Sequence, residues 1–264
     1  MFKTRLISGI VLVAIALAVI ISGNYILFFT LLGISLIGMQ ELYKVMNVHT
    51  DKFTSLEIAG YLGAILYYGV LLIDFNKYGL MAIMVAFLVL MFVYVFAYPK
   101  YTADQVMPAF FGIFYVAVMM SFIYLTRCLD NGKILVWLIF LCSWGCDTCA
   151  YCVGVLIGKH KMAPVLSPKK SIEGAFGGVI GAAGLGAGYA AVFGAEVWKY
   201  AVICAVGALI SMVGDLAASA IKRNKGIKDY GRLIPGHGGI LDRFDSVIFT
   251  APIIYYLCVL LIGA

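Results

Sequence analysis

Long apolar runs separated by short polar segments make up most of the chain. Charged or turn residues bound each run, and most runs approach the ~20 residues that a helix needs to cross a bilayer. The runs cover 6–22, 25–46, 56–73, 78–98, 105–127, 133–157, 174–194, 197–221 and 241–263. The pattern therefore predicts an all-α polytopic integral membrane protein with about nine transmembrane helices.

Composition supports the same class of protein. Of the 264 residues, 64% are apolar and only 12% are charged, which lies far outside the range of soluble globular domains. The basic opening before the first apolar run resembles a secretory signal, but no small-residue cleavage site follows that run. We therefore interpret the first run as a transmembrane helix.

The net charge of +6 is explained by membrane topology. With a cytoplasmic amino terminus, Lys77, Arg127, Lys133 and Lys199 are the outward-facing bases, and the remaining fifteen of the 19 Lys and Arg residues face inward. Basic residues accumulate on the cytoplasmic side of membrane proteins. We therefore expect a multi-pass protein of the cell (inner) membrane, with loops 158–173 and 222–240 on the cytoplasmic face and no nucleic-acid partner.

Polar chemistry is concentrated in the second half of the chain. We expect residues 1–104 to form mainly architectural helices, and residues 105–264 to form a catalytic transmembrane region. A group of charges in the first half lies around one cytoplasmic turn, and we interpret it as a solvated loop that anchors two helix ends. Its members are Glu41, Lys44, His49, Asp51, Lys52 and Glu57.

Small residues in the predicted helices 133–157 and 174–194 indicate close packing. Cys142, Cys146 and Cys149 form a narrow helical stripe, and helical spacing does not converge sulfurs on one metal as a turn does. We therefore expect these cysteines to pack as small apolar residues. The glycine pairs allow neighbouring helices to approach closely, and could hold helices 133–157 and 197–221 around one cavity. The pairs are Gly174/Gly178, Gly177/Gly181 and Gly184/Gly188.

A polar stripe on the helix 197–221 indicates a site. Ser211, Asp215, Ser219 and Lys222 fall within about 80° of helix surface. A charged carboxylate inside a membrane costs free energy, so it usually marks a functional site. Asp242 and Asp245 begin the last span and share one face if that segment is helical. The three carboxylates Asp215, Asp242 and Asp245 could hold Mg²⁺, which prefers oxygen ligands. The alternative is that Asp242 and Asp245 cap the helix and pair with nearby bases.

The two cytoplasmic loops supply candidate phosphate ligands. Their bases could serve only as topology determinants, but the turn Pro235-Gly-His-Gly-Gly239 lets backbone N–H groups approach a ligand. We expect His237 to contact phosphate or to form a local hydrogen bond. Loop 158–173 adds hydroxyls, lysines and a helix amino terminus near residue 173, which together form a plausible anion-binding rim. Asp147, mid-span on helix 133–157, is expected to be buried and is a further functional candidate.

Two blocks of residues resemble the phosphatidate cytidylyltransferases, also called CDP-diacylglycerol synthases. One block is Ser219-Ala-Ile-Lys222-Arg223, Lys228-Asp229-Tyr-Gly231 and Ile234-Pro235-Gly-His237-Gly238-Gly239-Ile240-Leu-Asp242-Arg243-Phe244-Asp245. The other is Asp147-Thr-Cys-Ala-Tyr151, Gly154, Gly158-Lys-His-Lys161, Ser167-Pro-Lys-Lys170 and Glu173-Gly174. Cys149 stands where glycine is usual, and Ser171-Ile172 replaces a common Thr-Trp. The resemblance covers roughly 142–246.

The resemblance implies that CTP and phosphatidic acid react to give CDP-diacylglycerol and pyrophosphate. It also implies Mg²⁺ and, in some members, K⁺ at paired aspartates. We expect membrane lipids as partners and a homodimer. The candidate catalytic residues are Asp215, Asp242, Lys222 and Asp147. The candidate substrate-binding residues are Ser219, Arg223, Lys228, His237, Gly238, Gly239, Ser167 and Lys170.

Two other classes of function stay open. Another CTP-using membrane lipid enzyme, such as a polyprenol kinase or a CDP-archaeol-type synthase, would need a similar phosphate site. A cation-coupled transporter would also place carboxylates inside helices, but it would carry them in inverted repeats. Here the polar residues lie in one half of the chain, which favours the enzyme.

Overall fold

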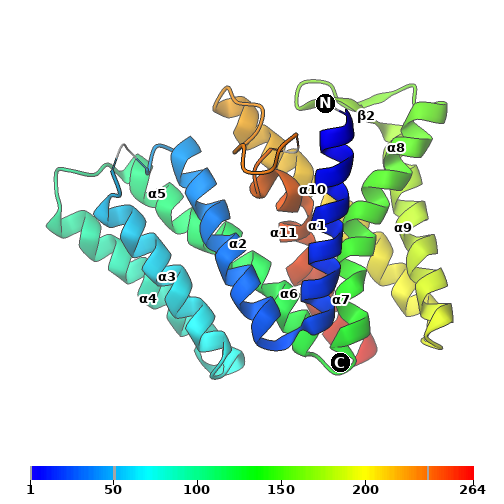
Figure 1. The fold of residues 1–264 in the computed structure, drawn as a ribbon, viewed down its shortest axis with the longest axis horizontal. Helices are drawn as coiled ribbons and strands as arrows, with labels where there is room; N and C mark the ends of the chain where they lie inside the picture. Colours follow the sequence, from blue (N-terminus) through cyan, green and yellow to red (C-terminus); the bar gives the residue numbers. More distant parts are fainter. Residues whose placement is uncertain (1, 50–51, 237) are drawn as a thin grey trace. The chain divides into compact units, whose positions relative to one another are not determined.

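The computed structural model describes residues 2–49, 52–236 and 238–264 (Figure 1). Among these residues, seven helices are long and apolar enough to cross a membrane, and the apolar helices Gly9–Ser22 and Ser55–Leu71 are shorter. The chain is thus a helical polytopic membrane protein, as hydropathy predicted. The prediction of nine crossings with a cytoplasmic amino terminus remains a prediction.

Two compact units make up the structure. Unit 1 comprises Met1–Ser121 and Asp229–Arg243, and unit 2 comprises Phe122–Lys228 and Phe244–Ala264. The segment 229–243, late in the sequence, therefore belongs with the first helices. The functional division expected at residue 104 is a separate matter and stays a prediction.

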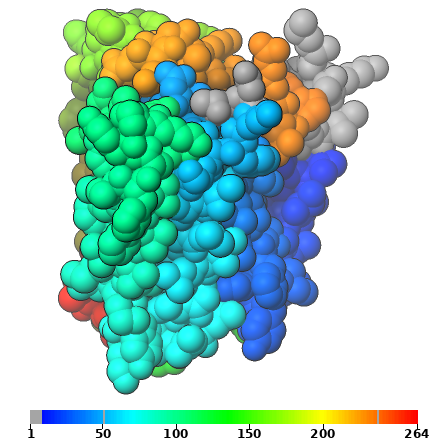
Figure 2. Space-filling view, turned by 90° about the vertical axis from the view of Figure 1, so that its left-hand side faces the viewer, coloured from blue at the N-terminus to red at the C-terminus, as the bar shows by residue number. Residues whose placement is uncertain are grey.

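Unit 1 is built from helices that cover the first half of the chain. Its elements are α1 (Phe2–Ser22), α2 (Asn24–Val45), α3 (Ser55–Leu71), α4 (Phe75–Phe96), α5 (Ala103–Gly112) and the π-helical η1 (Ile113–Val118), followed by the start of α6 (Met119–Cys128). Figure 2 shows the face of this unit on which α3 and α4 lie, in cyan. Leu62, Leu80 and Phe96 are exposed there, as expected of helices that face lipid.

Tyr43 packs closely against small residues in the interior of unit 1. The Tyr43 hydroxyl donates to the Ala109 carbonyl at 2.7 Å, and the Tyr43 side chain is fully buried. A Cβ at Gly60 or at Gly112 would overlap the Tyr43 ring. Close helix packing thus fixes the carboxy-terminal half of α2, which carries Glu41.

Unit 2 holds the remaining elements. They are the rest of α6, α7 (Gly132–Phe140), the π-helical η2 (Leu141–Gly145), α8 (Cys146–Ile157), β1 (Lys161–Ala163), β2 (Ser167–Ser171), α9 (Ile172–Val192), α10 (Val197–Asn224), α11 (Leu241–Leu257) after its first residues, and the π-helical η3 (Cys258–Ile262). β1 and β2 pair antiparallel, with Lys161 opposite Ser171. The all-α fold class is confirmed for the apolar helices, whereas the ribbon in loop 158–173 was not predicted, because it is too short to give a hydropathy signal.

The glycine face of α9 packs closely on its neighbours. A Cβ at Gly178 would lie 2.9 Å from the Cys146 Sγ of α8, and one at Gly186 would lie 2.5 Å from the Cys204 Sγ of α10. The predicted roles of the glycines and of the buried cysteines in packing are thus confirmed. The pair Gly184/Gly188 was assigned wrongly, since a Cβ at either position would meet nothing within 4 Å.

Candidate active site

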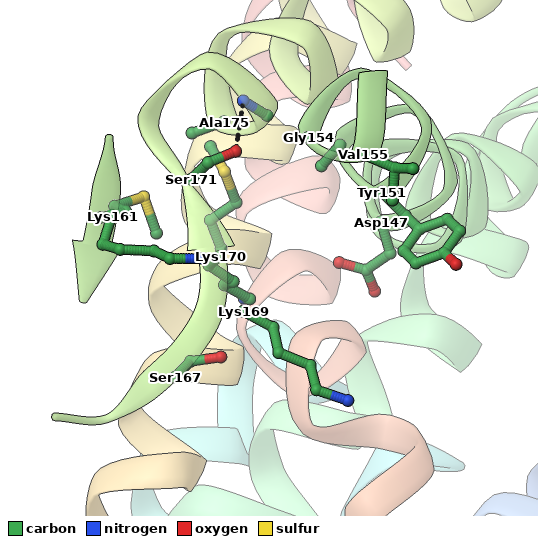
Figure 3. Close-up of a pocket in the computed structure, with 14 residues that line it drawn as sticks. Asp147, Tyr151, Gly154, Val155, Lys161, Ser167, Lys169, Lys170, Ser171 and Ala175 are labelled. Atoms are coloured by element: carbon green, nitrogen blue, oxygen red, sulfur yellow. Dashed lines mark hydrogen bonds between the residues drawn. The ribbon is translucent and has the colours of Figure 1, made fainter. Parts of the chain in front are cut away.

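A cavity in unit 2 collects residues from the two sequence blocks. Its volume is about 500 Å³. Asp147 and Tyr151 of α8 line one side, and Lys161, Ser167 and Lys170 of the β1–β2 ribbon line the other (Figure 3). Met212 of α10 also lines it. Close packing by the glycines of α9 therefore holds α8 and α10 around one cavity, as predicted.

Asp147 is placed differently from the expectation of a buried aspartate. Its side chain is exposed and lines the cavity, and in Figure 3 its carboxylate lies across the cavity from the ribbon. The residue is the second of α8, which follows directly on the π-helical η2, and such single π turns are frequent at functional sites. An open carboxylate at this position is accessible to a ligand.

Asp215 is the centre of a polar group next to this cavity. It forms an ion pair with Lys170 of β2, and the Ser219 hydroxyl donates to its Oδ1 at 3.4 Å. The exposed fractions of the Lys170 and Asp215 side chains are 25% and 28%. The structure thus brings the predicted polar stripe of α10 together with a lysine of loop 158–173.

Lys222 and Asp245 form a second pair in unit 2. The Lys222 Nζ lies 3.9 Å from the Asp245 Oδ2, and the two side chains are 11% and 14% exposed. Asp147 and Asp215 both lie close enough to Asp245 to repel it electrostatically. Lys161 and Lys169 line the same cavity as Asp147, so carboxylates and ammonium groups are mixed at this site.

No three His, Cys, Asp or Glu side chains within the described ranges are positioned together to hold a metal ion. Asp215 and Asp245 instead have lysine partners, as the two ion pairs show. Their oxygen donors are nevertheless of the kind that Mg²⁺ prefers. The predicted metal ligands Asp215, Asp242 and Asp245 remain a prediction.

Asp242 shapes the segment before α11, which lies in unit 1. We call residues 229–236 and 238–240 the signature loop. The Asp242 Oδ2 accepts the Tyr230 N–H at 2.8 Å and the Gly239 N–H at 2.9 Å, and the side chain is buried. Gly238 adopts a φ of +87°, which glycine tolerates readily, and pairs with Ile234. This carboxylate therefore braces the loop that precedes α11.

Glu41 of α2, which is distant in the sequence, also binds the end of this loop. Its Oε1 accepts the Ile240 N–H and its Oε2 the Leu241 N–H, each at 3.0 Å. It is 7% exposed, so the interpretation of Glu41 as part of a solvated group was wrong. The sequence feature that could have indicated this role is the apolar character of the neighbouring residues Met39, Leu42 and Tyr43, which are all buried.

The other predicted residues occupy varied positions. Arg223 is exposed, and its Nη1 donates to the Ile227 carbonyl at 3.3 Å, while Lys228 is exposed. His237 lies outside the described residues. Ser211 is buried, and its Oγ has no hydrogen-bond partner among the side chains and backbone described.

The start of α9 was expected to contribute an anion-binding rim. Ser171 caps this helix, because its Oγ accepts the Gly174 N–H at 3.1 Å. The Glu173 carboxylate accepts the backbone N–H groups of Lys159 and His160 and contacts the His160 ring at 2.6 Å. These contacts fold the turn between α8 and the ribbon, and the positive side chains that line the cavity come from Lys161, Lys169 and Lys170.

Comparison with known proteins decides the family. The model of the Cytidylyltransferase family matches residues 3–261. The chain belongs to this family. Phosphatidate cytidylyltransferases of Staphylococcus aureus (strain COL) and Staphylococcus epidermidis (strain ATCC 12228 / FDA PCI 1200) are each 33% identical to it, and that of Staphylococcus saprophyticus is 32% identical. Each alignment covers 97% of this chain and 99% of the relative.

The match to the cytidylyltransferase family extends over both units. The sequence motifs covered roughly residues 142–246, whereas the family model begins at residue 3. The helices α1 to α5 thus belong to the family's common architecture. Glu41 lies in this part of the cytidylyltransferase.

Proposed function

We propose that this enzyme is a phosphatidate cytidylyltransferase, which converts CTP and phosphatidic acid to CDP-diacylglycerol and pyrophosphate in phospholipid biosynthesis. The observation that carries the proposal is the cavity of unit 2, where Asp147 faces the lysines of the ribbon beside the Lys170–Asp215 pair. Polar and apolar residues both line it, which suits substrates with phosphate groups and a lipid product. The family and the names of the relatives support the same reaction.

The residues of the cavity have complementary roles in this proposal. Lys161 and Lys170 attract the CTP phosphates, and Lys222 offsets negative charge near Asp245. Ser219 orients Asp215 through its hydrogen bond. Phosphoryl transfer of this kind depends mainly on positioning and charge stabilisation, so the phosphate oxygen of phosphatidic acid attacks the α-phosphorus and pyrophosphate leaves. Arg223, Lys228 and His237 remain proposed phosphate contacts.

Mg²⁺ is the proposed cofactor, with Asp215, Asp242 and Asp245 as its proposed ligands. The carboxylate oxygens of these residues are of the kind that Mg²⁺ prefers, which supports the proposal. When bound, Mg²⁺ would neutralise charge that develops on the phosphates during transfer. A K⁺ ion beside it is part of the same proposal. We also propose that the site opens to the cytoplasm at the cell membrane, and that the enzyme is a homodimer.

The decisive assay supplies purified enzyme in phospholipid–detergent micelles with CTP, Mg²⁺ and phosphatidic acid. CDP-diacylglycerol and pyrophosphate are expected in equal amounts. Asp215→Asn should abolish turnover, whereas Asp130→Asn, an exposed aspartate elsewhere in unit 2, should leave it unchanged. Release of CDP without pyrophosphate would indicate a lipid kinase. Failure of folded enzyme to form CDP-diacylglycerol would refute the proposal.

A further inference from the structure

We propose that Glu41 is a positioning residue for the transferase reaction and that it fixes the signature loop and the first turn of α11. The inference rests on the proposed function, because it assigns the loop to that reaction. It gives the amino-terminal helices a specific task. All the contacts that carry it lie within unit 1.

The contact between Glu41 and the loop is bidentate. Each carboxylate oxygen accepts one backbone N–H, from Ile240 and from Leu241. These amides belong to the amino terminus of α11, where N–H groups have no partner inside the helix and where negative charge is favourable. Hydrogen bonds to an ionised acceptor are also stronger than neutral ones. The pair therefore fixes where α11 begins.

The loop is shaped to fit this carboxylate. A Cβ at Gly231 or at Gly239 would overlap the carboxylate of Glu41. The backbone thus approaches the Glu41 side chain closely at both ends of the signature loop. This close approach explains why glycine occupies both positions, since neither of them has a positive φ.

Glu41 and Asp242 act on one continuous stretch of backbone. The Gly239 N–H donates to Asp242, and the next two N–H groups donate to Glu41. Three consecutive amides are therefore held by two carboxylates. Asp242 is itself the first acidic residue of α11, so a shift of the Glu41 contact would move the proposed catalytic Asp242. The loss of an outer contact that orients a functional carboxylate typically lowers activity by 10- to 100-fold.

The test compares Glu41→Gln with Glu57→Gln. Glutamine keeps the size of Glu41 but replaces one acceptor oxygen by an NH₂ group, which cannot accept an amide N–H. Glu57 is a matched control, because it is buried in the same unit but bonds to His49 and Tyr61. The measurements are kcat and KM for CTP, and hydrogen exchange of the amides of residues 239–241.

We expect Glu41→Gln to lower kcat by about 10- to 100-fold, with a smaller change in KM, and to accelerate exchange at residues 239–241. Glu57→Gln should change neither kcat nor this exchange. Unchanged kcat or unchanged loop exchange in folded Glu41→Gln protein would overturn the proposal. If Glu41→Gln does not fold, Gly239→Ala decides, because its methyl group displaces the same carboxylate and should lower kcat in the same way.

The exchange measurement separates this proposal from the proposed function. A wild-type enzyme that does not act on phosphatidic acid would refute the substrate. Faster exchange at residues 239–241 in Glu41→Gln would still show that Glu41 holds the loop. Normal wild-type turnover with an unaffected Glu41→Gln variant would refute the positioning role alone.

Discussion

The close approach of α9 and α10 predicts a specific effect of Gly186→Ala. The added Cβ would lie 2.5 Å from the Cys204 Sγ and 2.8 Å from the Tyr200 carbonyl oxygen. A helical carbonyl cannot rotate away, so the two helices must separate. Overpacking of this kind costs about 1–3 kcal/mol, and the better helix propensity of alanine offsets up to ~1 kcal/mol. We expect a net loss of about 1–2 kcal/mol in the free energy of unfolding.

Two glycines of the same helix provide the controls for this prediction. Gly184 and Gly188 are exposed, and a Cβ at either would meet nothing within 4 Å. Alanine there should leave the melting temperature unchanged or raise it slightly. Thermal unfolding of the detergent-purified variants, followed by intrinsic fluorescence, should place Gly186→Ala roughly 2–8 °C below wild type. A Gly186→Ala variant that melts at or above the two controls would refute the packing argument.

Two further predictions concern unit 2. Lys222→Met should lower CDP-diacylglycerol formation at least about tenfold, because it leaves the Asp245 carboxylate without its ammonium partner. Turnover of this variant at the wild-type rate would contradict a role of Lys222 in the reaction. Ser171→Ala should lower the free energy of unfolding by about 1 kcal/mol, because it removes the cap of α9, whereas Ser167→Ala, in the same strand, should leave the melting temperature near that of wild type. Equal melting temperatures for the two serine variants would show that the cap contributes nothing measurable.

Hydropathy predicted the helices well because the length of an apolar run is set by the membrane. The run 25–46 corresponds to α2 (Asn24–Val45), and the run 174–194 to α9 (Ile172–Val192). The β1–β2 ribbon has strands of only three and five residues, and such short polar strands have no periodic signal. The π-helical turns were also missed, because they interrupt apolar runs without changing their composition.

Candidate residues were predictable where helical spacing brings them together. Ser219 and Asp215 are one turn apart on α10, and their hydrogen bond follows from that spacing. The ion pair between Lys170 and Asp215 was not predictable, because it depends on how the ribbon folds back against α10. Pairings of this kind depend on tertiary structure, which spacing along one helix does not report.

Glu41 shows a different reason for failure. The charged residues between positions 41 and 57 are close in the sequence, and such clusters of charge usually lie in a solvent-exposed loop. The structure separates them: Glu41 is buried within the last turns of α2 and bonds to residues 240 and 241, while Glu57 is buried in α3 and bonds to His49. The two amide N–H groups at the start of α11 donate to the Glu41 carboxylate, and a hydrogen-bonded polar group is tolerated when buried. Glu41 can therefore be buried without a neighbouring base.

The position of Asp242 links the structural and the chemical roles of the signature motif. Asp242 braces the signature loop in unit 1, and Asp245, three residues later in α11, lies beside Lys222 in unit 2. Both residues belong to α11, so the residue at which this helix begins sets the helical register of both carboxylates. Glu41 holds that beginning through the amides of Ile240 and Leu241. The glycines and Asp242 of this motif therefore have a structural role, because they fold the backbone that leads into α11.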